Sequence, residues 1–306
     1  MDGLRLSLDA LQVLDAIDRR GSFAAAGEEL FRTASTLSYV IQKLESELNV
    51  TVFDRSGHRA RLTPAGRTLL DDGRVLLHAA RRLEHRVRRV ESGWEAELRI
   101  VVDAIVAFAP VVPTIDAFAA LGGPTRLRLL SEVLGGSWEA LAADRADLVI
   151  GAAGPVPSLP GCSHRVLGDL PVAFVVAPVH PLADLGEPLT RELLRAQRAI
   201  AIGDSSHHQP PRSLGLLDGQ DTLVVPTVDA KLLLLLAGLG VGYLPRHVVA
   251  PHIERGALIE KPVVEGRASD TLHLAWREGE LGEAGRWWID RLSTSAFARA
   301  IGLRAD

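Results

Sequence analysis

The stretch GSFAAAGEELFRTASTLSYVIQKLE, residues Gly21–Glu45, predicts two short helices joined by a tight turn. In the second helix the apolar side chains recur at i, i+4, i+7 and i+11, which places them on one buried stripe: Leu37, Ile41, Leu44 and Leu48. The polar side chains point away from this stripe, because successive helical residues are turned by about 100°. The segment therefore packs through its leucines and presents hydroxyl, amide and aromatic groups outward.

A third helix precedes this pair and a basic hairpin follows it. Ser7 is a good N-cap for a helix whose leucines keep a helical period, and Gly21 ends that helix. Downstream, Phe53 and Leu62 flank the turn signal Ser56-Gly57, which predicts a short hairpin. The hairpin carries a cluster of basic side chains: Arg55, His58, Arg59 and Arg61.

A helix pair with a polar outer face, followed by a basic hairpin, indicates a winged helix-turn-helix that binds duplex DNA. Short polar side chains can reach base edges in the major groove, while arginines neutralise phosphates. A solvated helix face is the alternative explanation for the polar residues, and the clustered arginines favour DNA. We expect the DNA contacts to come from Thr33, Ala34, Ser35, Thr36, Ser38, Tyr39, Gln42, Lys43, Arg55, His58, Arg59 and Arg61.

The next segment predicts a long helix that pairs with a second copy of itself. Thr63-Pro64 is an N-cap followed by proline at the first helical position, and the helix runs to about Glu91. A heptad stripe, with smaller residues in the adjoining row, is what two helices need to pack along their length. The heptad residues are Leu69, Leu76, Leu83 and Val90, and the adjoining row is Gly73, Ala80 and Val87.

Composition is that of a globular protein of two or three domains. The 306 residues contain 47% hydrophobic and 24% charged residues. No apolar run is long enough to span a membrane, and the N-terminus lacks a signal-peptide pattern, so we expect a cytoplasmic protein. The one cysteine, Cys162, excludes an internal disulfide and a multi-cysteine metal site. Residues 1–92 hold 15 Lys+Arg and 13 Asp+Glu, against 19 and 25 in the remainder, so this N-terminal part is the one suited to a polyanion.

From Leu98 onward, short apolar runs alternate with helical segments, which predicts an α/β domain with mainly parallel strands. The expected strands are Leu98–Val102, Leu127–Leu130, Leu148–Ile150, Val172–Val176, Ala199–Ile202, Leu223–Val225, Gly242–Leu244 and Leu272–Trp276.

The N-terminal motifs resemble the winged helix of the LysR-type transcriptional regulators. The matching segments are Gly21-Ser22-Phe23, Ala24-Ala25-Ala26, Ser38, Leu44-Glu45, Phe53-Asp54-Arg55 and Leu62-Thr63-Pro64-Ala65-Gly66. This chain departs from the pattern at Ala34 and Val40, where many members carry glutamine; Ala34 can contact a thymine methyl group instead.

The body resembles the family's effector-binding domain, which looks like a periplasmic binding protein with a ligand cleft between two α/β lobes. The matching segments are Leu134–Leu141, Asp147–Gly151, His180–Ala183 and Gly238–Pro245. The resemblance implies a winged helix-turn-helix domain over residues 1–66, with its motif at about 23–42. It also implies a linker and dimerisation helix over 64–92 and an effector-binding domain over 93–306. Lobe I is expected at about 93–166 and 269–306, and lobe II at about 167–268.

The partners implied by the resemblance are double-stranded promoter DNA, a small organic effector, RNA polymerase and further copies of the chain. The copies form a homodimer or a homotetramer, with tetramers built from dimers favoured. No cofactor, metal, membrane contact or enzymatic activity is expected. An enzyme with a regulatory head and a structural adaptor are the alternatives. The enzyme alternative lacks a recognisable catalytic motif. The hairpin arginines argue against the adaptor alternative.

Effector contacts are expected where strands end and helices begin, because backbone amides are free there and side chains converge. The candidates are Asp103, Ala104, Ile105, Glu132, Val133, Leu134, Gly203, Asp204, Ser205, Thr227, Val228 and Asp229. Packing or capping is the alternative role for each. Because Asp103 and Glu132 are acidic, a neutral or partly apolar ligand is favoured over a dianion.

Overall fold

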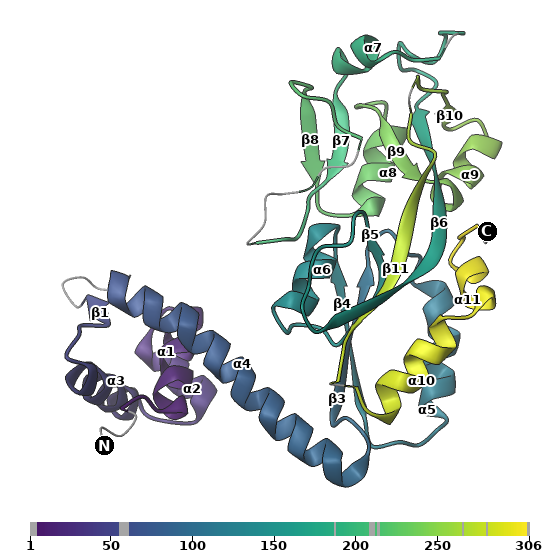
Figure 1. The fold of residues 1–306 in the computed structure, drawn as a ribbon. Helices are drawn as coiled ribbons and strands as arrows, with labels where there is room; N and C mark the ends of the chain where they lie inside the picture. The colour runs from purple at the N-terminus through teal and green to yellow at the C-terminus, as the bar shows by residue number, and fades with distance from the viewer. Residues whose placement is uncertain are drawn as a thin grey trace. The chain divides into compact units, whose positions relative to one another are not determined.

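The computed structural model describes residues 5–54, 61–186, 188–207, 212, 215–264, 266–279 and 281–304 (Figure 1). The chain forms two compact units, Met1–Arg88 and Arg89–Asp306. Each unit is described by itself below. None of the helices in the described ranges has the length and apolar content needed to cross a bilayer.

The N-terminal unit is built on three helices with matching polar caps. They are α1 (Leu8–Arg20), α2 (Phe23–Leu30) and α3 (Ala34–Leu48). The hydroxyls of Ser7, Ser22 and Thr33 each accept a hydrogen bond from the backbone N–H three residues later, which satisfies one free donor per helix. The predicted stripe of α3 is buried at Leu37, Ile41 and Leu44, within one core shared by all three helices.

The predicted hairpin is present at both of its described ends. Strand β1 (Phe53–Asp54) pairs antiparallel with β2 (Arg61–Leu62), and Phe53 lies opposite Leu62. Glu45 of α3 accepts hydrogen bonds from the backbone N–H groups of Val52 and Phe53, at 2.7 and 3.2 Å. The Leu44-Glu45 motif therefore fixes where the hairpin leaves the helical core.

Helix α4 (Pro64–Ser92) begins at the predicted proline. The Thr63 hydroxyl accepts a hydrogen bond from the N–H of Gly66, and a Cβ atom added at Gly66 would lie only 2.2 Å from the carbonyl oxygen of Val52. The motif thus ends in glycine because the backbone of the preceding segment passes against it.

One part of the heptad prediction is wrong. Gly73 is buried within its own unit, because it packs against the side chain of Leu11 in α1; a Cβ at Gly73 would lie 2.7 Å from Leu11 Cδ2. Gly73 is therefore a close contact inside the unit and is not part of a row facing a second helix. Leu76, Leu83 and Val87 are on the outside, with 46%, 53% and 62% of their surface exposed.

The C-terminal unit is built around a seven-stranded mixed sheet. Its strand order is β10-β6-β11-β5-β3-β4, with β9 also paired to β6. The strands are β3 (Glu97–Asp103), β4 (Arg126–Glu132), β5 (Leu148–Ala153), β6 (Cys162–Val176), β9 (Gly242–Pro245), β10 (Ile259–Glu260) and β11 (Ser269–Arg277). A separate parallel pair is formed by β7 (Ala199–Ile202) and β8 (Thr222–Val225).

Each predicted strand falls inside an observed one, but the expected parallel arrangement needs correction. Strands β3, β4 and β5 are parallel, whereas every pairing of β6 and β11 is antiparallel. These two long strands connect the lobes, and they run in opposite directions because the chain enters lobe II along β6 and returns along β11. The first half of β6 was not predicted, because Cys162–Asp169 has exposed polar residues and no apolar run.

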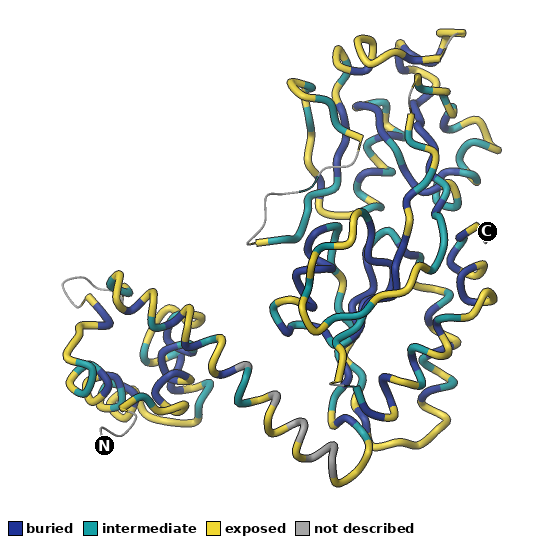
Figure 2. Tube along the Cα trace, viewed as in Figure 1, coloured by how far each residue is buried: buried dark blue, intermediate teal, exposed yellow. Residues whose placement is uncertain are grey.

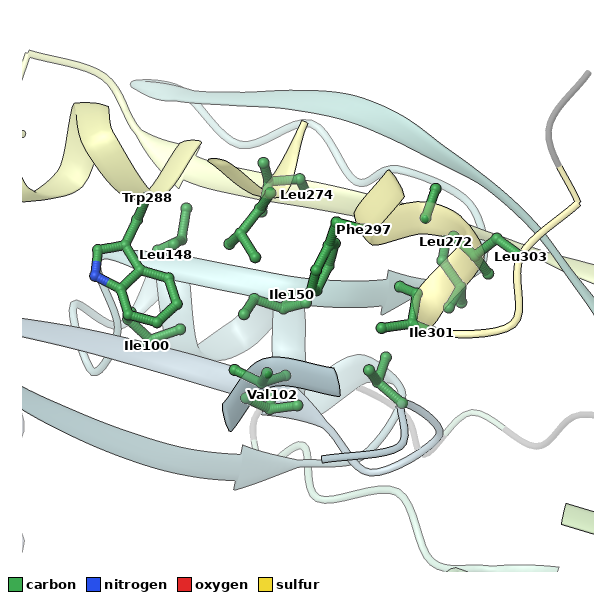
Figure 3. Close-up of a cluster of buried hydrophobic side chains, with 14 of the residues drawn as sticks. Ile100, Val102, Leu148, Ile150, Leu272, Leu274, Trp288, Phe297, Ile301 and Leu303 are labelled. Carbon is green, nitrogen blue, oxygen red and sulfur yellow. The ribbon is translucent and has the colours of Figure 1, made fainter. Parts of the chain in front are cut away.

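Lobe I has helices on both sides of its strands. They are α5 (Val112–Ala119), which follows the 3-10 turn η1 (Ala109–Val111), α6 (Gly135–Ala142), α10 (Glu283–Leu292) and α11 (Ser295–Ala300). Trp288 and Phe297 from the two C-terminal helices pack onto Ile100, Leu148 and Leu274 of the sheet (Figure 3). Strand β5 is buried along its whole length (Figure 2).

Lobe II is smaller. It contains α7 (Arg191–Arg195), α8 (Val228–Leu236) and α9 (Arg246–Glu254) with strands β7 to β10. Its core joins β6, β7 and β9 to the two longer helices through Val175, Ile200, Leu235, Leu244 and Val249. Gly238 ends the α8 segment with a positive φ of 70° and leads into β9, as expected for a helix stop rather than a nucleotide-binding loop.

Candidate nucleic-acid interface and ligand pocket

The outer face of α3 carries a connected group of hydroxyls at its start. Thr33 Oγ1 lies 2.9 Å from Ser35 Oγ and 2.8 Å from Thr36 Oγ1, and it also accepts from the Thr36 N–H. The Thr33 hydroxyl is thus the helix cap, a role the sequence pattern allowed but did not single out. Ala34 is exposed beside this group at the first helical position, and Ser38 is half-buried.

Further along the same face the side chains are free to meet a partner. Tyr39 is 67% exposed, and the Gln42 amide is exposed without a hydrogen bond to any described residue. Lys43 is exposed and lies 3.7 Å from Glu47 in an ion pair one turn along. Arg61 is exposed at the end of the hairpin, while Arg55, His58 and Arg59 lie outside the described residues.

Phe31 was missed by sequence reasoning. It occupies the turn between α2 and α3 with a left-handed φ of 55°, and 97% of its surface is exposed. Aromatic residues seldom adopt this backbone conformation. A large apolar side chain placed outward beside a polar helix face is suited to contact a partner there, since Phe31 adds nothing to the core.

A second candidate site lies in the C-terminal unit, between the two lobes. This pocket is lined by both lobes and has an open volume of about 70 Å³. The lining residues are Asp103, Ala104, Ile105, Val133, Leu134, Val172, Ala201, Ile202, Val228, Lys231, Tyr243, Leu244, Pro245, Arg267 and Asp270. A mostly apolar wall with a few charged groups is typical of a small-molecule site.

Half of the predicted effector residues line this pocket. They are Asp103, Ala104, Ile105, Val133, Leu134 and Val228. The other six, Glu132, Gly203, Asp204, Ser205, Thr227 and Asp229, do not line it. Thr227 caps α8 by accepting from the Ala230 N–H at 3.1 Å, and Asp229 is exposed in the first turn of that helix.

Glu132, Asp204 and Ser205 instead hold the lobes together. The Ser205 hydroxyl donates to Glu132 Oε2 at 2.5 Å and accepts from the Val133 N–H at 2.8 Å. Glu132 also pairs with Arg145. Asp204 accepts from the backbone N–H of Gly136 at 3.2 Å, so it occupies the start of α6 from the opposite lobe.

Asp204 is held in its charged form. Burial by itself would raise the pKa of this carboxyl, but hydrogen bonds from the backbone of Arg212, Ser206 and Gly136 outweigh burial and lower the pKa below its ordinary value. The N-terminus of α6 is therefore already occupied by the Asp204 carboxylate, so it does not offer a free binding site for the carboxylate of a ligand.

Asp103 has the opposite character. It is buried at the end of β3, where it accepts from the Ser137 hydroxyl at 2.6 Å and from the Ile105 N–H at 3.1 Å. Burial raises the pKa of Asp103 to about 7, against the effect of these donors, and the charge of Asp204 raises it further. The pKa of the Asp103 carboxyl is therefore close to neutral pH, and its hydrogen bonds hold the side chain within lobe I.

Four charged or polar lining residues from lobe II and β11 were missed: Lys231, Tyr243, Arg267 and Asp270. Lys231 is buried. Its pKa is lowered to about 8, mainly by burial and to a smaller extent by the positive charge of Arg267. Arg267 pairs with Asp270, and the Tyr243 hydroxyl accepts from the backbone N–H of Arg267 at 3.4 Å. A lysine inside the otherwise apolar run VDAKLLLLL was the available signal for Lys231; no local pattern marked Arg267.

Comparison with known proteins gives the family. Residues 8–67 match the family described as "Bacterial regulatory helix-turn-helix protein, lysR family", and residues 91–296 match the "LysR substrate binding domain". The chain belongs to the LysR family of transcriptional regulators. It has the family's helix-turn-helix DNA-binding domain and its effector-binding domain.

Two relatives from Escherichia coli K12 are similar over nearly the whole chain. The uncharacterised HTH-type transcriptional regulator YeeY is 42% identical, covering 98% of this chain and 97% of its own length. The probable HTH-type transcriptional regulator YhaJ is 44% identical, covering 93% and 95%. The structure of full-length CbnR in complex with its target DNA has a TM-score of 0.61 at 20% identity, covering 94% of this LysR-family chain and all of that one. The fold is thus that of full-length LysR regulators.

The described residues contain no group of three or more His, Cys, Asp or Glu side chains that could hold a metal ion. Cys162, the one cysteine of the sequence, is half-buried at the start of β6.

Proposed function

We propose that this chain acts in the cytoplasm as a homo-oligomeric sensor of a small organic molecule. The ligand occupies the interlobe pocket and changes how the helix-turn-helix domain engages promoter DNA. The observation that carries this proposal is the presence, in one chain of this family, of a pocket whose wall comes from both lobes. A ligand that contacts both lobes can favour one arrangement of them over another, which is the requirement for control by an effector.

For DNA binding we propose the exposed side chains of α3 and the hairpin. Gln42 can pair with adenine through two hydrogen bonds, and Lys43 and Arg61 can neutralise phosphates. The exposure of all three residues supports these roles. The similar CbnR structure contains its target DNA, which supports the same use of this domain.

For assembly we propose a homodimer joined through α4, and a homotetramer where two dimers associate. The exposed stripe Leu76, Leu83 and Val87 supports this, because three apolar side chains at heptad-related spacing are otherwise left in water. A contact with RNA polymerase is part of the proposal through the family resemblance.

We infer that the pocket binds its ligand without transforming it. The relatives YeeY and YhaJ are named as transcriptional regulators. The Ser205 hydroxyl, which a search for a nucleophile would single out, bridges the lobes through Glu132 and Val133. Its role is accounted for by that contact.

The decisive experiment joins a metabolite screen to a DNA footprint. Binding sites are first selected from random DNA with the full-length protein, and metabolites are screened by thermal shift. We expect at least one stabilising compound to alter the footprint and to be recovered unchanged. A stabilising compound that is converted to product, or the failure of every stabilising compound to alter the footprint, would contradict the proposed function.

A further inference from the structure

Lys231 is an unusual residue within its helix. Helix α8 is apolar apart from Asp229 in its first turn and Lys231 two residues later, and only 7% of the surface of Lys231 is exposed. Its ammonium group makes no hydrogen bond or ion pair with any residue in the described part of the chain. Burying an unpaired ammonium is unfavourable, because the group loses its hydration and receives no counter-charge.

Lys231 stands where two cavities adjoin. It lines the interlobe pocket and, together with Gly242, a smaller cavity inside lobe II. Its Nζ would lie 3.3 Å from a Cβ atom added at Gly242, so the ammonium lies against the start of β9. Gly242 leaves room for the lysine because it has no side chain. The remaining wall near it is largely apolar and includes Ile202, Val228 and Leu244.

The other charged groups of the pocket cannot neutralise Lys231. Asp270 is paired with Arg267, whose own positive charge acts against that of Lys231. Asp103 is held by donors of lobe I, and the charge that acts on it is that of Asp204. Among the described lining residues, Lys231 is therefore the cation that has no ion-pair partner, whereas Arg267 is paired with Asp270.

We propose that the pocket selects a small organic monoanion, a monocarboxylate with an apolar body, whose carboxylate pairs with Lys231. A single carboxylate supplies the missing charge, whereas a second one would face Asp103 and the occupied terminus of α6. The apolar body fits against the aliphatic wall from both lobes. This inference rests on the proposed function, and it narrows the expectation of a neutral or partly apolar ligand to a partly apolar anion.

The test uses matched probe pairs that differ in charge but hardly in shape. The pairs are benzoate with benzamide, phenylacetate with phenylacetamide, and 4-methylpentanoate with its amide. Each is added to the full-length protein at about 10 mM, so that a ligand with a Kd of about 1 mM is close to saturating. Unfolding midpoints are followed by thermal shift, and binding is measured by calorimetry for the best pair.

Three variants separate a pairing role from a structural one. Lys231→Met removes the charge and keeps the length of the side chain, Lys231→Arg keeps the charge, and Arg195→Met removes a positive charge from the exposed face of α7. We expect a carboxylate to bind wild type and Arg195→Met at least about tenfold more tightly than its amide, since hydrogen bonds to charged groups are strong. Lys231→Met should lose this preference, and Lys231→Arg should retain part of it.

A measurement without ligand completes the test. Because the unpaired ammonium opposes folding, ligand-free Lys231→Met should unfold at a higher temperature than wild type. A lower midpoint for ligand-free Lys231→Met, equal stabilisation by carboxylates and amides, no stabilisation by any carboxylate, or a preference that survives Lys231→Met would each overturn the inference. A neutral metabolite that alters the DNA footprint would overturn it too, and would leave the proposed function in place.

Discussion

The carboxylate of Asp204 accepts a hydrogen bond from the backbone N–H of Gly136 at 3.2 Å, so a side chain of one lobe caps a helix of the other. Ser205 continues the contact, and a Cβ atom added at Gly136 would lie only 1.9 Å from the Ser205 hydroxyl oxygen. The two lobes therefore meet here through a polar contact that leaves no space for a side chain at Gly136.

Gly136→Ala should loosen this contact. The new methyl group must displace Ser205 or the Glu132 carboxylate, so we expect the free energy of unfolding to fall by about 1–3 kcal/mol. Urea denaturation of the full-length protein measures the change. Gly186→Ala is the control, because a Cβ atom at Gly186 meets nothing within 4 Å. Equal stability of Gly136→Ala and Gly186→Ala would show that the lobes do not meet in this way in solution.

Asp103→Asn should change how stability depends on pH. The folded pKa of Asp103, about 7, lies above its ordinary value of 3.8, so the folded state holds the proton more tightly. The stability that this proton supplies is complete below about pH 4 and is lost as the pH rises to about 7. Relative to Asp103→Asn, wild type should lose on the order of a few kcal/mol across this window.

Denaturant titrations at several pH values measure the effect of Asp103. Asp116→Asn, on the exposed side of α5, is the control and should keep the wild-type pH profile. If wild type and Asp103→Asn have parallel profiles between pH 4 and 7, the carboxyl titrates as an ordinary surface group.

Gln42→Ala should relax base selection at one position of the DNA site. Loss of a two-hydrogen-bond contact with adenine should weaken specific binding by about 1–3 kcal/mol and leave non-specific binding nearly unchanged. Arg61→Ala provides the contrast, because loss of a phosphate contact should weaken all sequences alike and reduce the salt dependence by about one ion. Selection from random DNA gives the answer, and identical selected motifs would remove Gln42 from the set of base-reading residues.

Leu76→Glu combined with Leu83→Glu should dissociate the dimer. Both side chains are about half exposed within one chain, and like charges placed on the proposed helix seam repel each other across the symmetry axis. Light scattering gives the mass of the complex directly. Val75→Glu changes an exposed apolar residue on α4 away from that stripe, and it should leave the assembly intact. An unchanged mass for the double variant would place the interface elsewhere.

Local patterns predicted the elements well, because caps and apolar periods are properties of neighbouring residues. Ser7 caps α1 as expected, the hydroxyls of Ser22 and Thr33 cap the next two helices, and the strands lie where apolar runs occur. Strand direction was less predictable, since it depends on how β6 and β11 return through the sheet. The packing of Gly73 was also not predictable from local patterns, because the residue it packs against, Leu11, is far away in the sequence.

Half of the predicted effector residues line the pocket, and here too local patterns were informative where tertiary packing was not needed. Strand ends such as Asp103 and Val133 converge by the geometry of parallel sheets, so their placement follows from the elements alone. Ser205 and Glu132 have the same sequence character, yet they bind each other across the lobes. Lys231 reaches the pocket from the middle of a helix, a position that only the packing of α8 on β9 determines.

The pairing of β6 with β11 limits how the two lobes can move relative to each other. Their ladder runs from Ser269 opposite Pro171 to Arg277 opposite Cys162, with a register shift beside Gly168, whose φ is 139°. A hydrogen-bonded ribbon resists sliding of one strand along the other, because sliding breaks the whole ladder at once. It yields more readily to torsion, above all where an irregularity interrupts the ladder. If the lobes close on a ligand, as proposed above, we therefore expect the motion to be a rotation about the axis of this ribbon.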